Sequence, residues 1–142
     1  MTLPRIGFRL LTVVHRAIYR ASGGRALGHV GPLGVLLLTT TGRRSGLPRT
    51  VPLTYGPAGD GFVVIGSMGG APRDPDWCQN LRDSPDAVVE IGRRRIPVRA
   101  RFTEGEERER LWQLMVDGYG GYTGYQERTE RRIPVVVLES QT

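Results

Sequence analysis

The stretch LLLTTTGRRSGLPRTVPLTY, residues 36–55, decides the expected fold. Its apolar beginning belongs to a run over 35–40 that is typical of a buried strand, and residues 49–55 alternate as a half-buried strand does. Two glycines and three arginines lie around the bend between these segments, which predicts a turn that carries positive charge. The stretch therefore indicates β-structure with a cationic turn at one end.

The rest of the chain continues this pattern with short strands and few helices. The further predicted elements are a strand at 61–66 after a turn at 56–61, a helix at 74–85, strands at 87–91 and 96–102, a helix over 103–119 with a capping box at Thr103 and Glu106, and a last strand at 133–140. About six mostly antiparallel strands with outer helices favour a small β-barrel.

A basic amphipathic helix is predicted over residues 5–21, where four arginines fall on one stripe and apolar side chains on the other. The SGG sequence at 22–24 ends it. We therefore divide the chain into an N-terminal helix, 1–24, and a β-domain, 25–142. The helix is expected to pack on the core with a solvated arginine stripe. The alternative is a helix that lies on an anionic membrane surface.

Composition limits the classes of partner. The chain has 142 residues and a net charge of +6, and all twenty of its basic side chains are arginines, which favour phosphates and carboxylates. One cysteine and two histidines make an internal disulfide impossible and a metal site improbable. The arginines are dispersed and no nucleic-acid motif occurs, so no nucleic-acid partner is expected. With no signal peptide or transmembrane run in the sequence, we expect a cytoplasmic protein, with peripheral contact at the inner membrane face as the alternative.

The cationic turn has the chemistry of an anion-binding site. Successive backbone N–H groups in a glycine-containing bend can form an anion-binding nest, and the hydroxyls and guanidiniums around it add donors and charge. The alternative is a hairpin loop with solvated arginines. The residues assigned to the turn site are Thr41, Gly42, Arg43, Arg44, Ser45, Gly46 and Arg49.

A second glycine-rich bend, GSMGGAPRDPDWCQN at 66–80, also follows an apolar strand and leads into a helix. Its hydroxyl and amides are candidates for binding a planar ring edge or a phosphate, and two bends of this kind predict one shared cleft. Helical spacing puts Trp77 and Asn80 on one face, although a core tryptophan and a local cap are the alternatives. The residues assigned here are Ser67, Met68, Gly69, Gly70, Trp77 and Asn80.

Three tyrosines, Tyr119, Tyr122 and Tyr125, recur at three-residue spacing among glycines. This composition is typical of a mobile aromatic lid, with a surface loop of partly buried rings as the alternative. No nucleophile–base pair accompanies them, so any catalysis is expected to depend on a bound cofactor.

Three segments together resemble one known family: LLLTTTGRRSGLPRTVPLTY, SMGGAPRDPDWCQNL and YGGYTGYQERTERRIPVVVLE. They are similar, in order and spacing over about 27–140, to the deazaflavin-dependent nitroreductase family. The resemblance implies a split β-barrel of the FMN-binding split-barrel type. It also implies the cofactor F420, an 8-hydroxy-5-deazaflavin with a phosphate, lactate and oligoglutamate tail.

The resemblance also implies roles for the three segments. The first turn would hold the phosphate and acidic tail, the second bend would border the deazaflavin, and the three tyrosines would form the acceptor side. Three positions depart from the family pattern: Met68 replaces a lysine of some members, Cys78 a usual tyrosine, and Thr54, a substrate-binding position, a frequent tyrosine.

The function implied is hydride transfer from reduced F420 to a quinone, nitroaromatic or enone. Tyr122 or Tyr125 is the candidate proton donor, and Tyr119, Tyr122 and Tyr125 are the candidate catalytic residues. A non-catalytic carrier of F420 or a lipid, and an FMN-dependent reductase of the same fold, are the alternatives. The oligomeric state is left open.

Overall fold

The structure is a computed structural model, and it describes residues 29–30 and 33–142. The helix predicted over 5–21 and the domain boundary after residue 24 lie outside the described residues. Within the described part, no helix has both the length and the apolar character needed to cross a membrane.

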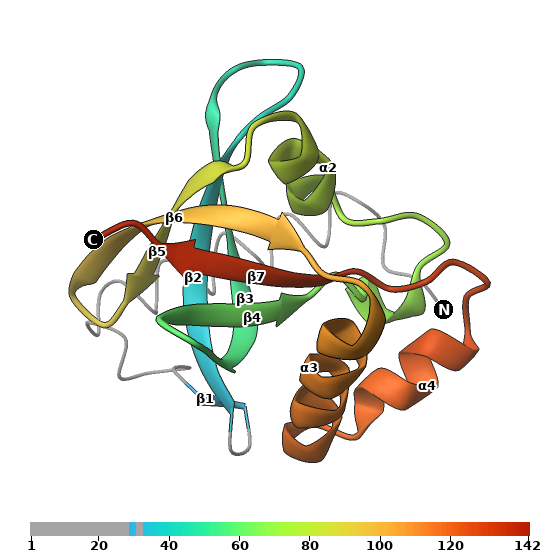
Figure 1. Cartoon of the computed structure of the whole chain (residues 1–142). Coiled ribbons are helices and arrows are strands. Elements are labelled where there is room, and N and C mark those ends of the chain that lie inside the picture. Colours follow the sequence, from blue (N-terminus) through green and yellow to red (C-terminus); the bar gives the residue numbers. More distant parts are fainter. Residues whose placement is uncertain (1–28, 31–32) are drawn as a thin grey trace.

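In the described residues, seven strands form one antiparallel sheet in the order β1-β2-β3-β4-β7-β6-β5, and an additional pairing of β2 with β5 closes it into a barrel (Figure 1). The strands are β1 (His29–Val30), β2 (Leu33–Thr41), β3 (Pro48–Ala58), β4 (Gly61–Ile65), β5 (Asp86–Ile91), β6 (Arg94–Phe102) and β7 (Val135–Ser140). A mainly β protein with a split barrel and flanking helices is confirmed.

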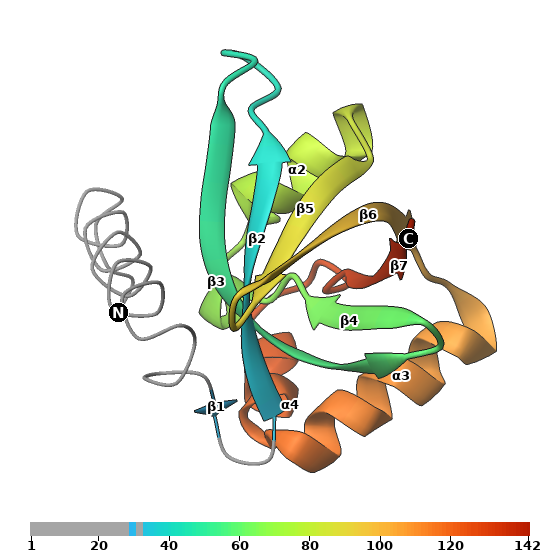
Figure 2. The ribbon, with the colours of Figure 1, turned by 90° about the vertical axis from the view of Figure 1, so that its left-hand side faces the viewer.

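The helices occupy two ends of the barrel (Figures 1 and 2). Helix α2 (Asp76–Asp83) lies near the β2–β3 turn, while α3 (Gly105–Gly118) and α4 (Gly121–Glu127) lie together at the opposite end. A short 3₁₀ turn, η1 (Met68–Gly70), contacts α4. The helices at both ends of the barrel therefore lie beside segments that the sequence marks as functional.

Two hydrophobic clusters hold these layers together. Leu36 and Leu38 of β2 point into the barrel and pack with Trp77 and Leu81 of α2. Alternate residues of β4 and β7 face outward, against the second cluster, which includes Met115 of α3. Because β4 and β7 are buried on both faces, their sequences are continuously apolar rather than alternating.

The predicted turn at 56–61 is wrong in its extent. Residues 56–58 continue β3 and pair with β4, so that only Gly59 and Asp60 remain in the turn. Gly56 serves close packing instead, because a Cβ there would lie 2.8 Å from the Leu114 side chain of α3 and 2.9 Å from the Met115 sulfur. Gly56, which suggested a turn in the sequence, thus lies where β3 packs closely against α3.

The capping box at Thr103 is also wrong. Thr103 donates its hydroxyl hydrogen to the Val135 carbonyl, at 2.8 Å, and α3 begins two residues later at Gly105. Gly105 has φ +63°, a conformation that favours glycine. The threonine therefore attaches the start of the helix to β7 rather than capping it.

The tyrosine–glycine segment contains a helix, α4, rather than forming a surface loop. Glycine is a poor helix former, so local propensity does not explain this helix. The helix is instead explained by burial of the Tyr122 ring, which packs against Trp112 of α3 and against the neighbouring Tyr119.

Candidate functional site

The β2–β3 turn uses several of its own amides to hold its shape. Gly42 donates to the Leu47 carbonyl and Gly46 to the Gly42 carbonyl, both at 2.8 Å, and Gly46 has φ +71°. The Ser45 hydroxyl accepts from the Leu47 amide at 3.1 Å and from Arg49 at 3.4 Å. The turn therefore offers a ligand mainly side-chain charge, from exposed guanidiniums, rather than a full nest of backbone amides.

Arg43 ties this turn to α2. Its backbone amide and its Nη1 both donate to Oδ1 of Asn80, at 3.2 and 3.0 Å, and its Nη2 lies 3.3 Å from the Asp76 carboxylate. Asn80 is 3% exposed and donates its own amide hydrogen to the Thr40 hydroxyl. Asn80 is thus neither a surface residue nor a local cap, and it fixes the turn against the helix.

The second bend has a strained backbone. Met68, Gly69 and Gly70 all have positive φ, at +44°, +66° and +83°. Such a conformation is costly for methionine, and strain of this kind is concentrated at functional sites. Met68 is also 41% exposed, so burial of its side chain does not explain the strain.

The bend leaves three amides unused. Gly70 and Ala71 donate to the carbonyls of Ser67 and Met68, at 2.9 and 3.2 Å. The amides of Ser67, Met68 and Gly69 donate to no acceptor in the described part of the chain. Left-handed residues that present consecutive free amides form a concave donor surface for an anion or a carbonyl oxygen.

A surface pocket of about 540 Å³ lies between Arg43 of the first turn and the segment that follows the glycines of the second bend. Its one carboxylate, Asp74, is already paired with Arg82 at 2.7 Å and with Arg131 at 2.8 Å. The remaining charge is positive, which suits an acidic ligand. The pocket is lined by Arg43, Pro72, Arg73, Asp74, Gln79, Arg82 and Arg131.

The tyrosines form a hydrogen-bonded cluster. The Tyr122 hydroxyl bonds to the Thr54 hydroxyl of β3, and the Tyr119 and Tyr125 hydroxyls bond to each other at 2.7 Å. Burial raises the pKa of Tyr122, and the hydrogen bond to Tyr119, with burial, raises the pKa of Tyr125 to about 12. Tyr122 and Tyr125 are therefore expected to be protonated near neutral pH.

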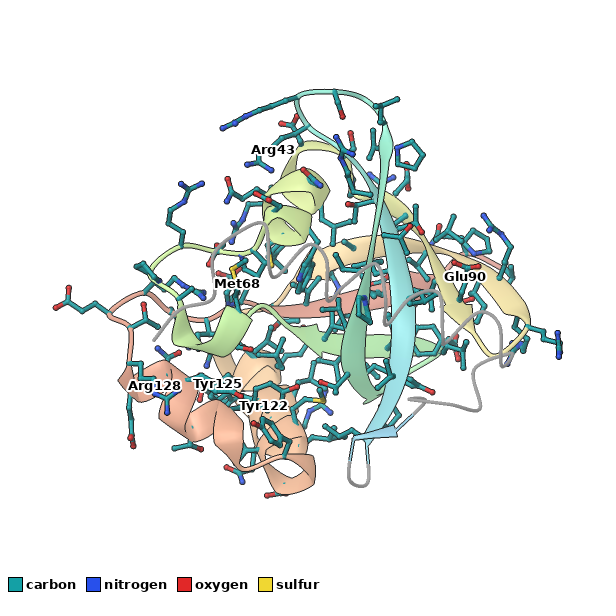
Figure 3. All side chains as sticks on the ribbon, turned by 180° about the vertical axis from the view of Figure 1, so that it is seen from behind. Arg43, Met68, Glu90, Tyr122, Tyr125 and Arg128 are labelled. Atoms are coloured by element: carbon teal, nitrogen blue, oxygen red, sulfur yellow. The ribbon has the colours of Figure 1, made fainter. Side chains whose placement is uncertain are left out.

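Direct contact joins the bend to α4. A Cβ at Gly70 would lie 2.6 Å from the Tyr125 carbonyl oxygen and 3.1 Å from the Arg128 Cβ. Figure 3 shows Met68 between Arg43, beside α2, and the pair formed by Tyr125 of α4 and Arg128 just after that helix. The three segments singled out in the sequence thus form one continuous surface.

The structure does not place every predicted residue at this surface. Trp77 is 6% exposed and belongs to the barrel core, so it has little surface to offer a ligand. Cys78 is buried, which raises the pKa of its thiol and keeps it neutral. Arg131 was missed, because it contacts the bend across about sixty residues of sequence and no local pattern marks it.

The fold defines a split β-barrel protein, and its described surface carries cationic side chains and free backbone amides, a chemistry that suits an acidic ligand. Residues 11–140 match the family model described as F420H2-dependent quinone reductase. An F420H2-dependent quinone reductase of Mycobacterium tuberculosis is 43% identical over 138 residues, which cover 94% of this chain and 91% of the relative. The chain belongs to the F420H2-dependent quinone reductase family, whose members are oxidoreductases that use coenzyme F420.

Solved structures agree with this assignment. An F420H2-dependent reductase superposes with a TM-score of 0.68 at 40% identity, covering 74% of this chain and 93% of its own. A second structure, described as a domain-swapped dimer, has a TM-score of 0.71 at 35% identity and covers 89% and 93%.

Proposed function

We propose that this chain reduces a quinone-type acceptor with F420H2, and that the cofactor lies across the two glycine-rich bends. One observation carries the proposal: the three unused amides at 67–69 lie in a bend that contacts the helix of the half-buried tyrosine pair, and the segment that continues this bend lines a pocket together with Arg43 of the first turn. The proposal rests on this chemistry and on the family to which the chain belongs.

The described residues fit F420. Its phosphate and oligoglutamate tail are acidic, and Arg44, Arg49 and Arg73 are exposed guanidiniums around the pocket and the turn. Its planar ring carries carbonyl oxygens, which match the free amides of the second bend. Arg43 contributes charge to the pocket while it holds the turn in place, so its role is at least partly one of positioning.

The tyrosine pair is the best-placed proton source. When bound, the cofactor supplies a hydride, and the acceptor oxygen that gains charge needs a proton. Two hydroxyls that share one hydrogen bond retain one further hydrogen, so the Tyr119–Tyr125 pair can donate to a ligand. Tyr122 is more buried and bonded to Thr54, and it orients α4 against β3. Tyr125 is therefore favoured over Tyr122 as the donor.

Other properties are proposed on the sequence alone. Nitroaromatics and enones are electron-poor like quinones and are proposed as further acceptors. A cytoplasmic location, with the helix predicted at 5–21 resting on the inner membrane face, would bring the enzyme to lipophilic quinones. Sedimentation with vesicles that contain anionic lipid, compared with neutral vesicles, tests the membrane contact.

The direct test of the function uses purified protein, F420H2 and menadione. We expect protein-dependent oxidation of F420H2 with formation of the reduced quinone, and much slower turnover with reduced FMN. Binding of oxidised F420 without turnover over a broad acceptor panel would instead indicate a carrier. Absence of both binding and turnover would contradict the proposal.

A pH profile tests the tyrosine pair. Because the pKa of Tyr125 is about 12, wild-type kcat should show no loss of this donor below about pH 10. Tyr119→Phe removes the bond that raises this pKa, so the alkaline fall should move about one unit lower. Tyr125→Phe should lower kcat by about 100-fold and abolish that alkaline limb. Identical profiles for wild type and Tyr119→Phe would refute the pairing.

A further inference from the structure

Arg131 makes an unusual set of bonds to the second glycine-rich bend. Its Nε donates to the Ala71 carbonyl at 2.7 Å, its Nη1 to the Gly66 carbonyl at 3.1 Å, and its Nη2 to the Ser67 carbonyl at 2.9 Å. Its Nη1 also lies 2.8 Å from the Asp74 carboxylate. One guanidinium therefore holds residues 66–74, and its side chain is only 14% exposed.

These bonds set the direction of the unused amides. In a trans peptide the C=O and the following N–H point in opposite directions. The Gly66 carbonyl belongs to the same peptide unit as the Ser67 amide, and the Ser67 carbonyl to the same unit as the Met68 amide. Because Arg131 draws both carbonyls toward itself, the Ser67 and Met68 amides point away from it. The positive charge on the carbonyl side also makes these amides stronger donors.

The same residue is anchored to the tyrosine helix. The Gln126 side chain of α4 donates to the Arg131 carbonyl at 2.8 Å and accepts from the Ile133 amide at 3.0 Å. The backbone of Arg131 is thus attached to α4, while its side chain holds the bend. This arrangement fixes the separation between the free amides and the Tyr119–Tyr125 pair.

We propose that Arg131 is a positioning residue that aims the Ser67 and Met68 amides at the cofactor ring and sets the distance from the ring to the acceptor side. The inference rests on the proposed function. Lysine cannot take this role, since its ammonium is a point charge that does not match three carbonyls spread around a planar fork.

The test compares Arg131→Lys and Arg131→Met with the neighbouring control Arg132→Met. Arg132 is exposed and bonds only to Glu109 among the described residues, so its loss should leave the bend intact. Three quantities are measured at a temperature at which circular dichroism shows each variant folded. They are the Kd of oxidised F420 from fluorescence, the KM for F420H2, and the F420-induced protection of amides 67–69 from hydrogen exchange.

We expect Kd and KM to rise 10- to 100-fold and amide protection to disappear in both Arg131 variants, with Arg132→Met within twofold of wild type. A role in stability alone would lower the melting temperature and leave Kd and protection unchanged in Arg131→Lys, which would overturn the inference. If the charge alone matters, Arg131→Lys binds as wild type and the positioning role is likewise overturned. Failure of the wild type to bind F420 would overturn the proposed function together with the ligand assigned here.

Discussion

Replacing Gly70 by alanine is expected to abolish measurable F420 binding and to lower the free energy of unfolding by about 2–4 kcal/mol. Gly70 has φ +83°, and a Cβ there would lie 2.6 Å from the backbone oxygen of Tyr125. A backbone oxygen cannot move aside as a flexible side chain can, so the bend or α4 must shift. Either shift displaces the free amides from the tyrosine pair. Urea unfolding and F420 titration measure the two effects.

Gly69 provides the matched control. It has φ +66°, yet a Cβ at this position would have no atom within 4 Å. Gly69→Ala should therefore cost only the conformational strain, about 1 kcal/mol. Equal losses in Gly69→Ala and Gly70→Ala would show that the contact between the bend and α4 contributes nothing.

Asn80→Ala is expected to lower the free energy of unfolding by about 2–3 kcal/mol and to weaken F420 binding. The substitution leaves the Arg43 amide and the buried Thr40 hydroxyl without their partner, and Nη1 of Arg43 loses its acceptor. The β2–β3 turn then loses its attachment to α2, and its arginines lose their fixed position.

Gln79 is the control on the same helix. Its side chain makes one bond to the Asp74 carbonyl, at 3.0 Å, in a less buried place. Gln79→Ala should cost less than about 1 kcal/mol. A smaller loss for Asn80→Ala than for Gln79→Ala would contradict the account of how the turn is held.

The fold could be predicted largely from local pattern. The apolar run over 35–40 and the two runs at 87–91 and 96–102 indicated strands, because each strand had to bury at least one apolar face, although β6 begins two residues earlier than predicted, at Arg94. The errors came from tertiary contacts. Gly56 is glycine because α3 packs against it, and α4 is helical because Tyr122 is buried, and neither cause is visible in the neighbouring residues.

The candidate site could be predicted in part. Glycines after apolar strands marked both bends, since glycine is needed where the backbone turns or approaches another segment. Of the residues assigned from the sequence, Arg43 alone lines the pocket between them. The sequence did not show which residues of the site face a ligand and which hold the structure in place. Asn80 proved to be a buried anchor and Trp77 a core residue, and Arg131 bonds to the second bend from a segment that follows α4. Such roles depend on contacts between distant segments.

The central claim is that guanidiniums of the first turn hold the acidic tail of F420. The direct measurement is the Kd of F420 for wild type and for Arg44→Gln/Arg49→Gln, each at low and high salt. We predict that wild-type affinity falls with salt, since exposed charges are screened, and that the double variant binds about 10–100-fold more weakly at low salt with little salt dependence. A double variant with the wild-type Kd and the wild-type salt dependence would contradict the claim.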